Sequence, residues 1–211
     1  VITILGTIFY EAWQLSAVTE EADRQVFFSK VFRIYASVMF CGVAGIIMLC
    51  QIMMRVFKAS YFEAWTFVPF LTLCSMCTCL NQFLNSIYVV YKRSTGSLVT
   101  MLCGAVVNLI LNYLFIQWFG PWGVTPASFI SLMLVFILRA YSTRGLLDMD
   151  FHPAWLLLNL ALVLGEIWFM FNVEHWALPV VAITAAVCAL NLREIFSMLD
   201  KLLGRFLKKS K

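Results

Sequence analysis

Long apolar runs separated by short polar gaps make up most of the 211-residue chain. A membrane-spanning helix needs about 20 mostly apolar residues, with about 17 as the lower limit. Six runs reach that length, some with their weakly polar flanks, and a partial one precedes them. All are too long for barrel strands of about 9–11 alternating residues. The pattern predicts an all-α, polytopic transmembrane bundle with six full spans and a partial N-terminal span. The runs are Val1–Val18, Ile34–Met54, Phe67–Val90, Leu98–Trp118, Val124–Leu138, Trp155–Phe171 and Trp176–Leu192.

The positive charges follow the same pattern and predict an orientation. All of the 15 Lys and Arg residues except Arg55 and Lys58 lie in alternate gaps, counted from the first, or in the C-terminal tail. Arg139 and Arg144, for example, follow the fifth run. Because cytoplasmic loops carry the excess of Lys and Arg, these gaps and the C-terminus are expected to face the cytoplasm. We therefore expect a multi-pass membrane protein whose C-terminus lies in the cytoplasm.

Composition also points to a membrane. Apolar residues make up 63% of the chain and charged residues 12%, whereas soluble domains have about 45–50% apolar residues. The net charge of +4 does not indicate nucleic-acid binding, because the basic residues are spread over several segments. In such segments they set topology and meet anionic lipid headgroups. The bilayer is thus an expected partner, and nucleic acid is not.

The chain divides into three expected parts, residues 1–144, 145–192 and 193–211. In the last part, apolar residues such as Ile195, Leu199 and Leu202 recur at helical spacing opposite charged ones. This pattern predicts an amphipathic helix that continues from the last span and lies on the inner membrane surface, as an anchor or a partner-binding segment. The first run begins with Val1 rather than Met. The simplest interpretation is the C-terminal part of a longer transporter.

Polar side chains within the spans are the candidate functional residues. Such groups are expensive in lipid and usually face the bundle interior or a water-filled cavity. Glu11 lies in the first run, Asn108 and Asn112 lie one helical turn apart in the fourth, and Glu166 lies near the middle of the sixth. Steps of three and four residues place a longer set on one face of the third run. Its members are Cys74, Thr78, Asn81, Asn85, Tyr88 and Lys92.

Depth and chemistry suggest what these faces bind. At 1.5 Å per residue, Asn81 lies about 16 Å from Lys92, and Asn108 about 16 Å from Ser97, so both are near the bilayer midplane. Amide and phenol groups bind sugar hydroxyls, while Lys92 and Arg93 attract phosphate. We therefore expect a path for a headgroup that bears sugars and phosphate. Its expected lining is Thr78, Asn81, Asn85, Tyr88, Asn108 and Asn112.

Several of these residues also have a purely structural interpretation. Asn side chains join helices in membranes at about 0.6–2 kcal/mol per bond. For Asn108 and Asn112, we weigh this helix-joining role equally with a role in lining a cavity. Glu11 is either a protonatable coupling site or a carboxylate neutralised by Arg in a missing half. Glu166 binds either a neighbouring helix or an ion, which would be H+ or Na+.

Cysteine and histidine do not form a recognisable catalytic or metal pattern. Cys74, Cys77 and Cys79 lie in an apolar run with no His nearby, and thiols there act as small apolar side chains. His152 and His175 fall in gaps expected on opposite sides of the membrane. The sequence contains no phosphate-binding Gly loop and no Ser/His/Asp set. Accordingly, we expect no cofactor, no metal and no enzyme activity.

Six pieces of sequence occur in an order and spacing that are fairly specific. They are Glu11–Ala17, Tyr61–Trp65 leading to Pro69, Ile87–Ser94, Asn108–Tyr113, the Gly120–Gly123 turn, and Arg139 at the end of the following span. Together they resemble the C-terminal half of bacterial oligosaccharide and polysaccharide flippases. These O-antigen flippase-like proteins belong to the multidrug/oligosaccharidyl-lipid/polysaccharide exporter superfamily. The resemblance covers roughly residues 1–144.

This resemblance implies a fold and a function. Such flippases have two helical lobes around a central cavity, plus two peripheral helices. Residues 1–144 would be the C-terminal transport lobe and residues 145–192 the peripheral helices, with Glu166 in one of them. The family moves undecaprenyl-diphosphate-linked oligosaccharide across the cytoplasmic membrane by alternating access, for cell-surface polysaccharide such as lipopolysaccharide. Glu11, Trp13 and the Asn-bearing faces would line the cavity, and an N-terminal lobe of the same polypeptide would complete it.

Three other functions compete with this one. A cation-coupled drug or metabolite exporter of the same superfamily would have a more apolar cavity and a decisive acidic site. A multi-span enzyme of polysaccharide assembly would need catalytic groups in a sizeable loop, but the longest gap, Ser16–Arg33, offers only Glu20, Glu21 and Asp23. A non-transporting scaffold would show no effect of cavity substitutions on any flux.

Overall fold

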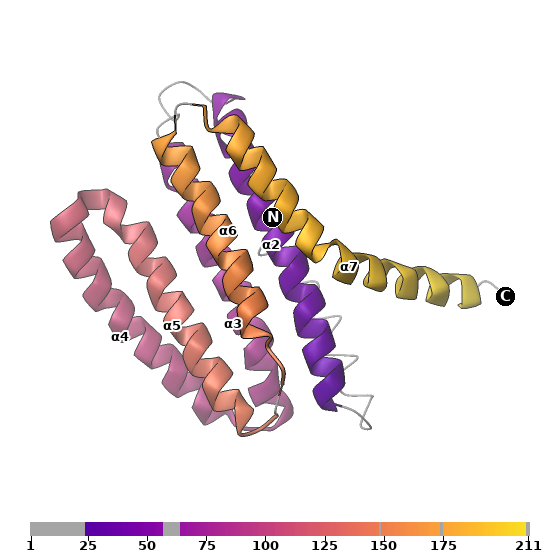
Figure 1. Ribbon diagram of the computed structural model, residues 1–211. Helices are drawn as coiled ribbons and strands as arrows, with labels where there is room; N and C mark the ends of the chain where they lie inside the picture. The colour runs from indigo at the N-terminus through magenta and orange to yellow at the C-terminus, as the bar shows by residue number, and fades with distance from the viewer. Residues whose placement is uncertain (1–23, 57–63, 148, 174, 210–211) are drawn as a thin grey trace. The chain divides into compact units, whose positions relative to one another are not determined.

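Every regular element of the computed structural model is a helix (Figure 1). The structure describes residues 24–56, 64–147, 149–173 and 175–209. No strand occurs among these residues, and the predicted all-α class is confirmed. The helices are α2 (Arg24–Val56), α3 (Val68–Val90), α4 (Ser94–Phe119), the short 3-10 helix η2 (Gly120–Gly123), α5 (Val124–Arg144), α6 (Pro153–Asn172) and α7 (Ala177–Lys209).

Five stretches of the described residues are long and apolar enough to cross a membrane. The longest, Ser94–Arg144, contains both α4 and α5, which run side by side because the chain turns back at η2 (Figure 1). The expected partial span in residues 1–18 lies outside the described residues. The predicted count of six full spans plus a partial one is therefore not confirmed. Several apolar helices compatible with a multi-pass membrane protein are present.

Local sequence explains where α3 ends. The N–H of Arg93 donates to the carbonyl of Tyr88 at 2.9 Å, and the N–H of Lys92 donates to the carbonyl of Val89 at 3.1 Å. This pair of bonds is a Schellman motif, whose central residue takes the left-handed conformation. Lys92 occupies that position with φ of 53°. The tight turn lets α4 begin at Ser94, directly after Arg93.

The first of two compact units contains the described residues up to Phe28 and those from Cys50 to Asp150. Within it, α5 packs against both α3 and α4. A small residue permits the close approach of η2 to α4: a Cβ added to Gly123 would lie 2.5 Å from the backbone oxygen of Phe115. The outer face of α4 is apolar and exposed, with Leu109 at 71%. An apolar outer face of this kind suits a helix surrounded by lipid.

The second unit contains Ser29–Leu49 of α2 and the described residues from Phe151 onward. In it, α6 packs against α7, and Phe40 of α2 packs edge-on against Trp155 of α6 with ring centroids 6.0 Å apart. The structure thus groups part of α2 with the two last helices, and the predicted division into residues 1–144, 145–192 and 193–211 stays a prediction. The helix α7 continues without a break through the predicted boundary at residues 192 and 193.

We predict that Gly123→Ala destabilises the protein by about 1–3 kcal/mol, because the added methyl group overpacks the contact of η2 with α4. The matched control is Gly42→Ala in α2, where an added Cβ has no atom within 4 Å. That change should stabilise the helix by about 0.5–1 kcal/mol. Unfolding in mixed micelles followed by circular dichroism measures both. Equal effects of the two substitutions would contradict the close approach at Gly123.

Candidate functional site

A cavity of about 570 Å³ lies among α3, α4 and α5 of the first unit. Apolar side chains such as Leu132 and Val135 form part of its wall, and the polar groups are amides, hydroxyls and one guanidinium. No Asp or Glu is among the described residues that line it. The polar lining residues are Thr78, Asn81, Gln82, Asn85, Ser97, Asn108, Ser128, Ser131 and Arg139.

Arg139 connects the three helices around this cavity. Its side chain is 7% exposed. From α5, its Nη1 donates to the backbone oxygen of Asn81 in α3 at 2.7 Å. Its Nε donates to the hydroxyl of Thr100 in α4 at 3.2 Å, and its Nη2 to the hydroxyl of Ser97 at 3.3 Å. The Ser97 hydroxyl in turn donates to Oδ1 of Asn85. A guanidinium is thereby held in the cavity wall by polar groups of two other helices.

The asparagines of the cavity also join helices. Asn81 donates from Nδ2 to the backbone oxygen of Leu132 at 3.0 Å. Asn108 donates to the hydroxyl of Ser131 at 2.8 Å and accepts a bond from Asn112 at 2.9 Å. For Asn108, the two interpretations left open by the sequence therefore hold together: its amide joins α4 to α5, and the same residue lines the cavity.

The structure brings together some of the predicted site residues and separates others. Thr78, Asn81, Asn85 and Asn108 line the cavity, whereas Asn112 contacts it only through Asn108. The rest lie elsewhere: Tyr88 and Arg93 line a second, smaller cavity, Lys92 is exposed and lines neither, Glu166 is buried in the second unit, and Glu11 and Trp13 lie outside the described residues. That the cavity takes a substrate stays a prediction.

Sequence reasoning missed Arg139 as a cavity residue. Since it follows an apolar run, it was interpreted as a charge of a cytoplasmic gap, but α5 continues through it to Arg144. Ser131, Val135 and Arg139 are four residues apart and thus share one helical face with the cavity. That spacing is the signal that identifies Arg139, and it also identifies Ser131.

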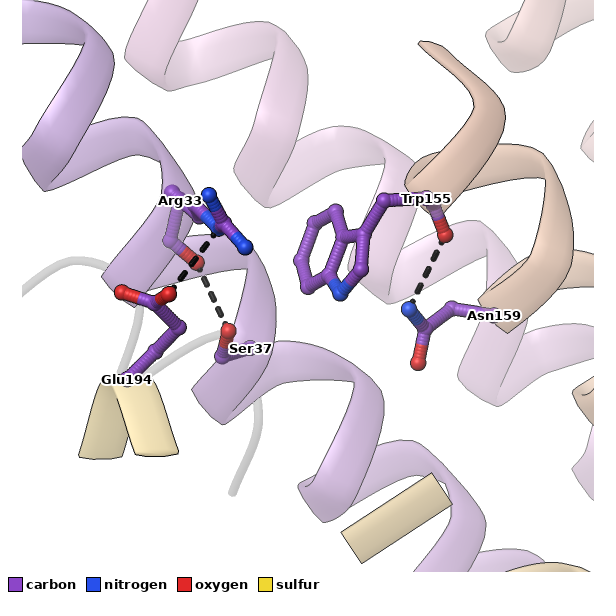
Figure 2. A network of polar contacts seen from close by, with 5 residues as sticks. All are labelled: Arg33, Ser37, Trp155, Asn159 and Glu194. Atoms are coloured by element: carbon purple, nitrogen blue, oxygen red, sulfur yellow. Dashed lines mark hydrogen bonds and ion pairs between the residues drawn. The ribbon is translucent and has the colours of Figure 1, made fainter. Parts of the chain in front are cut away.

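In the second unit, Arg33 of α2 lies between α6 and α7 (Figure 2). Its Nε forms an ion pair with Oε1 of Glu194 at 3.1 Å, and its guanidinium carbon lies 5.8 Å from the centroid of the Trp155 ring, within cation–π range. Ser37 donates to the carbonyl of Arg33 at 2.8 Å, and Asn159 donates to the carbonyl of Trp155 at 3.0 Å. These last two bonds lie within α2 and α6, whereas the ion pair and the cation–π contact of Arg33 hold α2 to α7 and to α6.

Two further polar pairs join α6 to α7, and all four residues are buried. Asn191 donates from Nδ2 to Oδ1 of Asn159 at 2.7 Å. The hydroxyl of Thr184 donates to Oε1 of Glu166 at 2.9 Å, while Oε2 of Glu166 has no hydrogen-bond partner among the described residues. Glu166 therefore binds a neighbouring helix, one of its two predicted roles, and its role toward an ion stays a prediction.

Comparison of the chain with protein-family models, curated proteins and solved structures finds no match. The resemblance to oligosaccharide flippases accordingly stays a prediction. The fold and the cavity define a helical protein whose several apolar helices are compatible with a multi-pass membrane protein.

We predict that the cavity contains water, so that a cysteine placed in it reacts with a charged methanethiosulfonate reagent. In liposomes treated on both faces, Asn85→Cys should react at least about tenfold faster than Leu109→Cys, because the thiolate is the reactive form and lipid suppresses it. Mass spectrometry measures the labelling of each variant, and the labelling of the unchanged chain is subtracted to give the rate at each introduced cysteine. Equal rates for the two positions would show that Asn85 faces no water.

We also predict that Asn159 and Asn191 are energetically coupled. A double-mutant cycle with both changed to Ala should give about 0.6–1.7 kcal/mol, the range measured for buried interhelical bonds in membranes. Asn172 supplies the control, because its side chain bonds to Trp168 within its own helix. A cycle of Asn172 with Asn191 should be additive. The same coupling in both cycles, measured by unfolding in micelles, would contradict the Asn159–Asn191 contact.

Proposed function

We propose that this protein is a transporter that flips lipid-linked, undecaprenyl-diphosphate-bound oligosaccharide across the cytoplasmic membrane by alternating access. The product would serve cell-surface polysaccharide biosynthesis. One observation carries the proposal: a cavity lined by amides, hydroxyls and the guanidinium of Arg139 lies among helices apolar enough to span a membrane. We place the C-terminus in the cytoplasm, on the distribution of Lys and Arg.

The chemistry of the cavity supports a substrate with a sugar-bearing headgroup. Asn85 and Asn108 carry amides, whose donors and acceptors suit the hydroxyl groups of a sugar. Part of this capacity is used between protein groups, since Asn85 accepts from Ser97 and Asn108 donates to Ser131. Arg139 places a positive charge in the cavity wall, which suits a phosphate group, while its nitrogens bond to Asn81, Ser97 and Thr100. The volume of about 570 Å³ falls within the range of about 300–1,000 Å³ of small-molecule sites. While its headgroup is bound in this cavity, the lipid tail of the substrate would remain in the bilayer around α4.

The same chemistry argues against the sister function of a drug exporter. That function predicts a more apolar cavity with a decisive acidic group. Among the described residues, the cavity is lined by several amides and by no carboxylate. Glu166, the buried acidic residue that the structure describes, belongs to the other unit. Coupling to H+ or Na+ is part of the proposal and is independent of the headgroup chemistry.

Translocation of a fluorescent lipid-linked oligosaccharide in proteoliposomes tests the proposal. The variant Asn81→Leu with Asn85→Leu, and separately Arg139→Gln, should lower the rate at least about tenfold, or about 1.4 kcal/mol, because they remove polar contacts to the headgroup. Asn172→Leu makes the matched change at an exposed position outside the cavity and should leave the rate within about twofold.

The transport rates of the Asn81/Asn85 double variant and of Arg139→Gln must be measured on folded protein. Asn81 and Arg139 also join helices, so circular dichroism must show unchanged helix content, and Asn85→Leu alone serves if either variant unfolds. A wild-type rate in the folded cavity variants would refute the transport role of the cavity.

A further inference from the structure

The helix α7 is longer than the hydrocarbon core of a membrane is thick. Its 33 residues extend for about 50 Å at 1.5 Å per residue, whereas that core is about 30 Å thick. The stretch of α7 that is apolar enough to cross a membrane is Ala177–Phe196. The helix continues to Lys209 and bends along its length (Figure 1). We call residues 195–209 the α7 tail, and most of this tail lies beyond the span.

An ion pair marks the point at which α7 leaves the span. Glu194, two residues before the end of the apolar stretch, pairs with Arg33 of α2 at 3.1 Å. Both side chains are partly exposed, at 19% for Glu194 and 35% for Arg33. Charged side chains are expensive in hydrocarbon, and those near helix ends reach the membrane interface. The contact therefore places the start of the α7 tail at the level of the lipid headgroups.

The helical register of the α7 tail separates its apolar residues from its main group of cations. Lys201, Arg205 and Lys208 follow one another at steps of four and three residues, so they share one face of the helix. The apolar residues fall on the opposite half of the helix circumference. They are Ile195, Phe196, Met198, Leu199, Leu202, Leu203, Phe206 and Leu207. A helix with a broad apolar face and a basic polar face lies in the plane of a membrane surface.

The charge of the α7 tail indicates which lipids it meets. The tail has four cationic residues and one acidic residue, Asp200, a net charge of +3. Anionic lipids give the membrane surface a negative potential that attracts basic segments next to a span. Their phosphate oxygens also accept charge-assisted hydrogen bonds from Lys and Arg. Between the anchoring and partner-binding roles that the sequence leaves open, charge complementarity therefore favours an anionic lipid surface.

We propose that the α7 tail lies on the membrane surface and binds anionic phospholipid headgroups through Lys201, Arg205 and Lys208. The apolar half of the tail rests on the acyl chains below. Because the tail continues from a span, it is held next to the surface and loses little further freedom on binding. The inference goes beyond the proposed transport, since this contact requires no translocated substrate and no residue of the large cavity.

Hydrogen–deuterium exchange of the full chain in lipid nanodiscs, measured by mass spectrometry, tests this contact. One set of discs contains phosphatidylcholine alone, and the other contains about one third phosphatidylglycerol. The amides of the α7 tail should exchange at least about tenfold more slowly in the anionic discs, because a helix held on the surface opens less often. About 1 M salt should remove most of that difference, since it shortens the Debye length to about 3 Å.

Two sets of substitutions test which cations bind the lipid. Lys201→Gln, Arg205→Gln and Lys208→Gln together should reduce the difference between the two discs to less than about twofold. Gln keeps a high helix propensity, so the tail can remain helical. The matched control makes the same charge change at three exposed cations of the first unit and should leave the difference unchanged. These control residues are Lys92, Arg93 and Arg144.

Equal exchange of the tail in the two lipids would overturn the proposal. Slow exchange in both would mean that the tail is held without regard to lipid charge, and fast exchange in both would mean that it extends into water, where a soluble partner could bind it. An equal loss of protection in the control variant would assign the effect to net charge rather than to the tail. The salt series uses the unchanged chain, so it decides the matter even if a variant fails to fold.

Discussion

The first unit depends on the hydrogen bonds that the guanidinium group of Arg139 makes. Its hydrogen bonds reach the backbone oxygen of Asn81 in α3 and the hydroxyls of Ser97 and Thr100 in α4. Arg139 lies five residues before the C-terminal end of α5, and a charged side chain within an apolar helix is costly unless polar groups surround it. Asn81 and Ser97, together with Asn85 and Asn108, also line the cavity. The polar groups that surround this one cation therefore also form the cavity that is proposed to hold a headgroup.

Features that depend on local sequence were predictable. The length of each apolar run fixed the helices, because the backbone of a lipid-exposed segment must satisfy its hydrogen bonds internally. Pro69 and Pro153 lie in the first turns of α3 and α6, where a missing N–H is harmless. The shared cavity position of Thr78, Asn81 and Asn85 followed from steps of three and four residues, since a helical face is a local property.

Features that depend on contacts between distant segments were not predictable. The charge of Arg139 and its position after the fifth apolar run place it in a polar gap between spans. Its long side chain nevertheless reaches partners 39 to 58 residues away in the sequence. The grouping of α2 with α6 and α7 rests on Arg33, Trp155 and Glu194, which no periodicity relates. The sequence predicts Tyr88 in the large cavity, but the residue lines the smaller one, where its ring packs on Gly96 of the next helix.

An experimental structure in a lipid nanodisc tests most directly whether Arg139 organises a polar cavity within the membrane. We expect its guanidinium to lie about 3 Å from the backbone oxygen of Asn81, with ordered water between Asn85 and Asn108. An Arg139 side chain that extends to the membrane surface, with apolar groups filling the space between those two asparagines, would contradict the cavity and the transport function proposed for it.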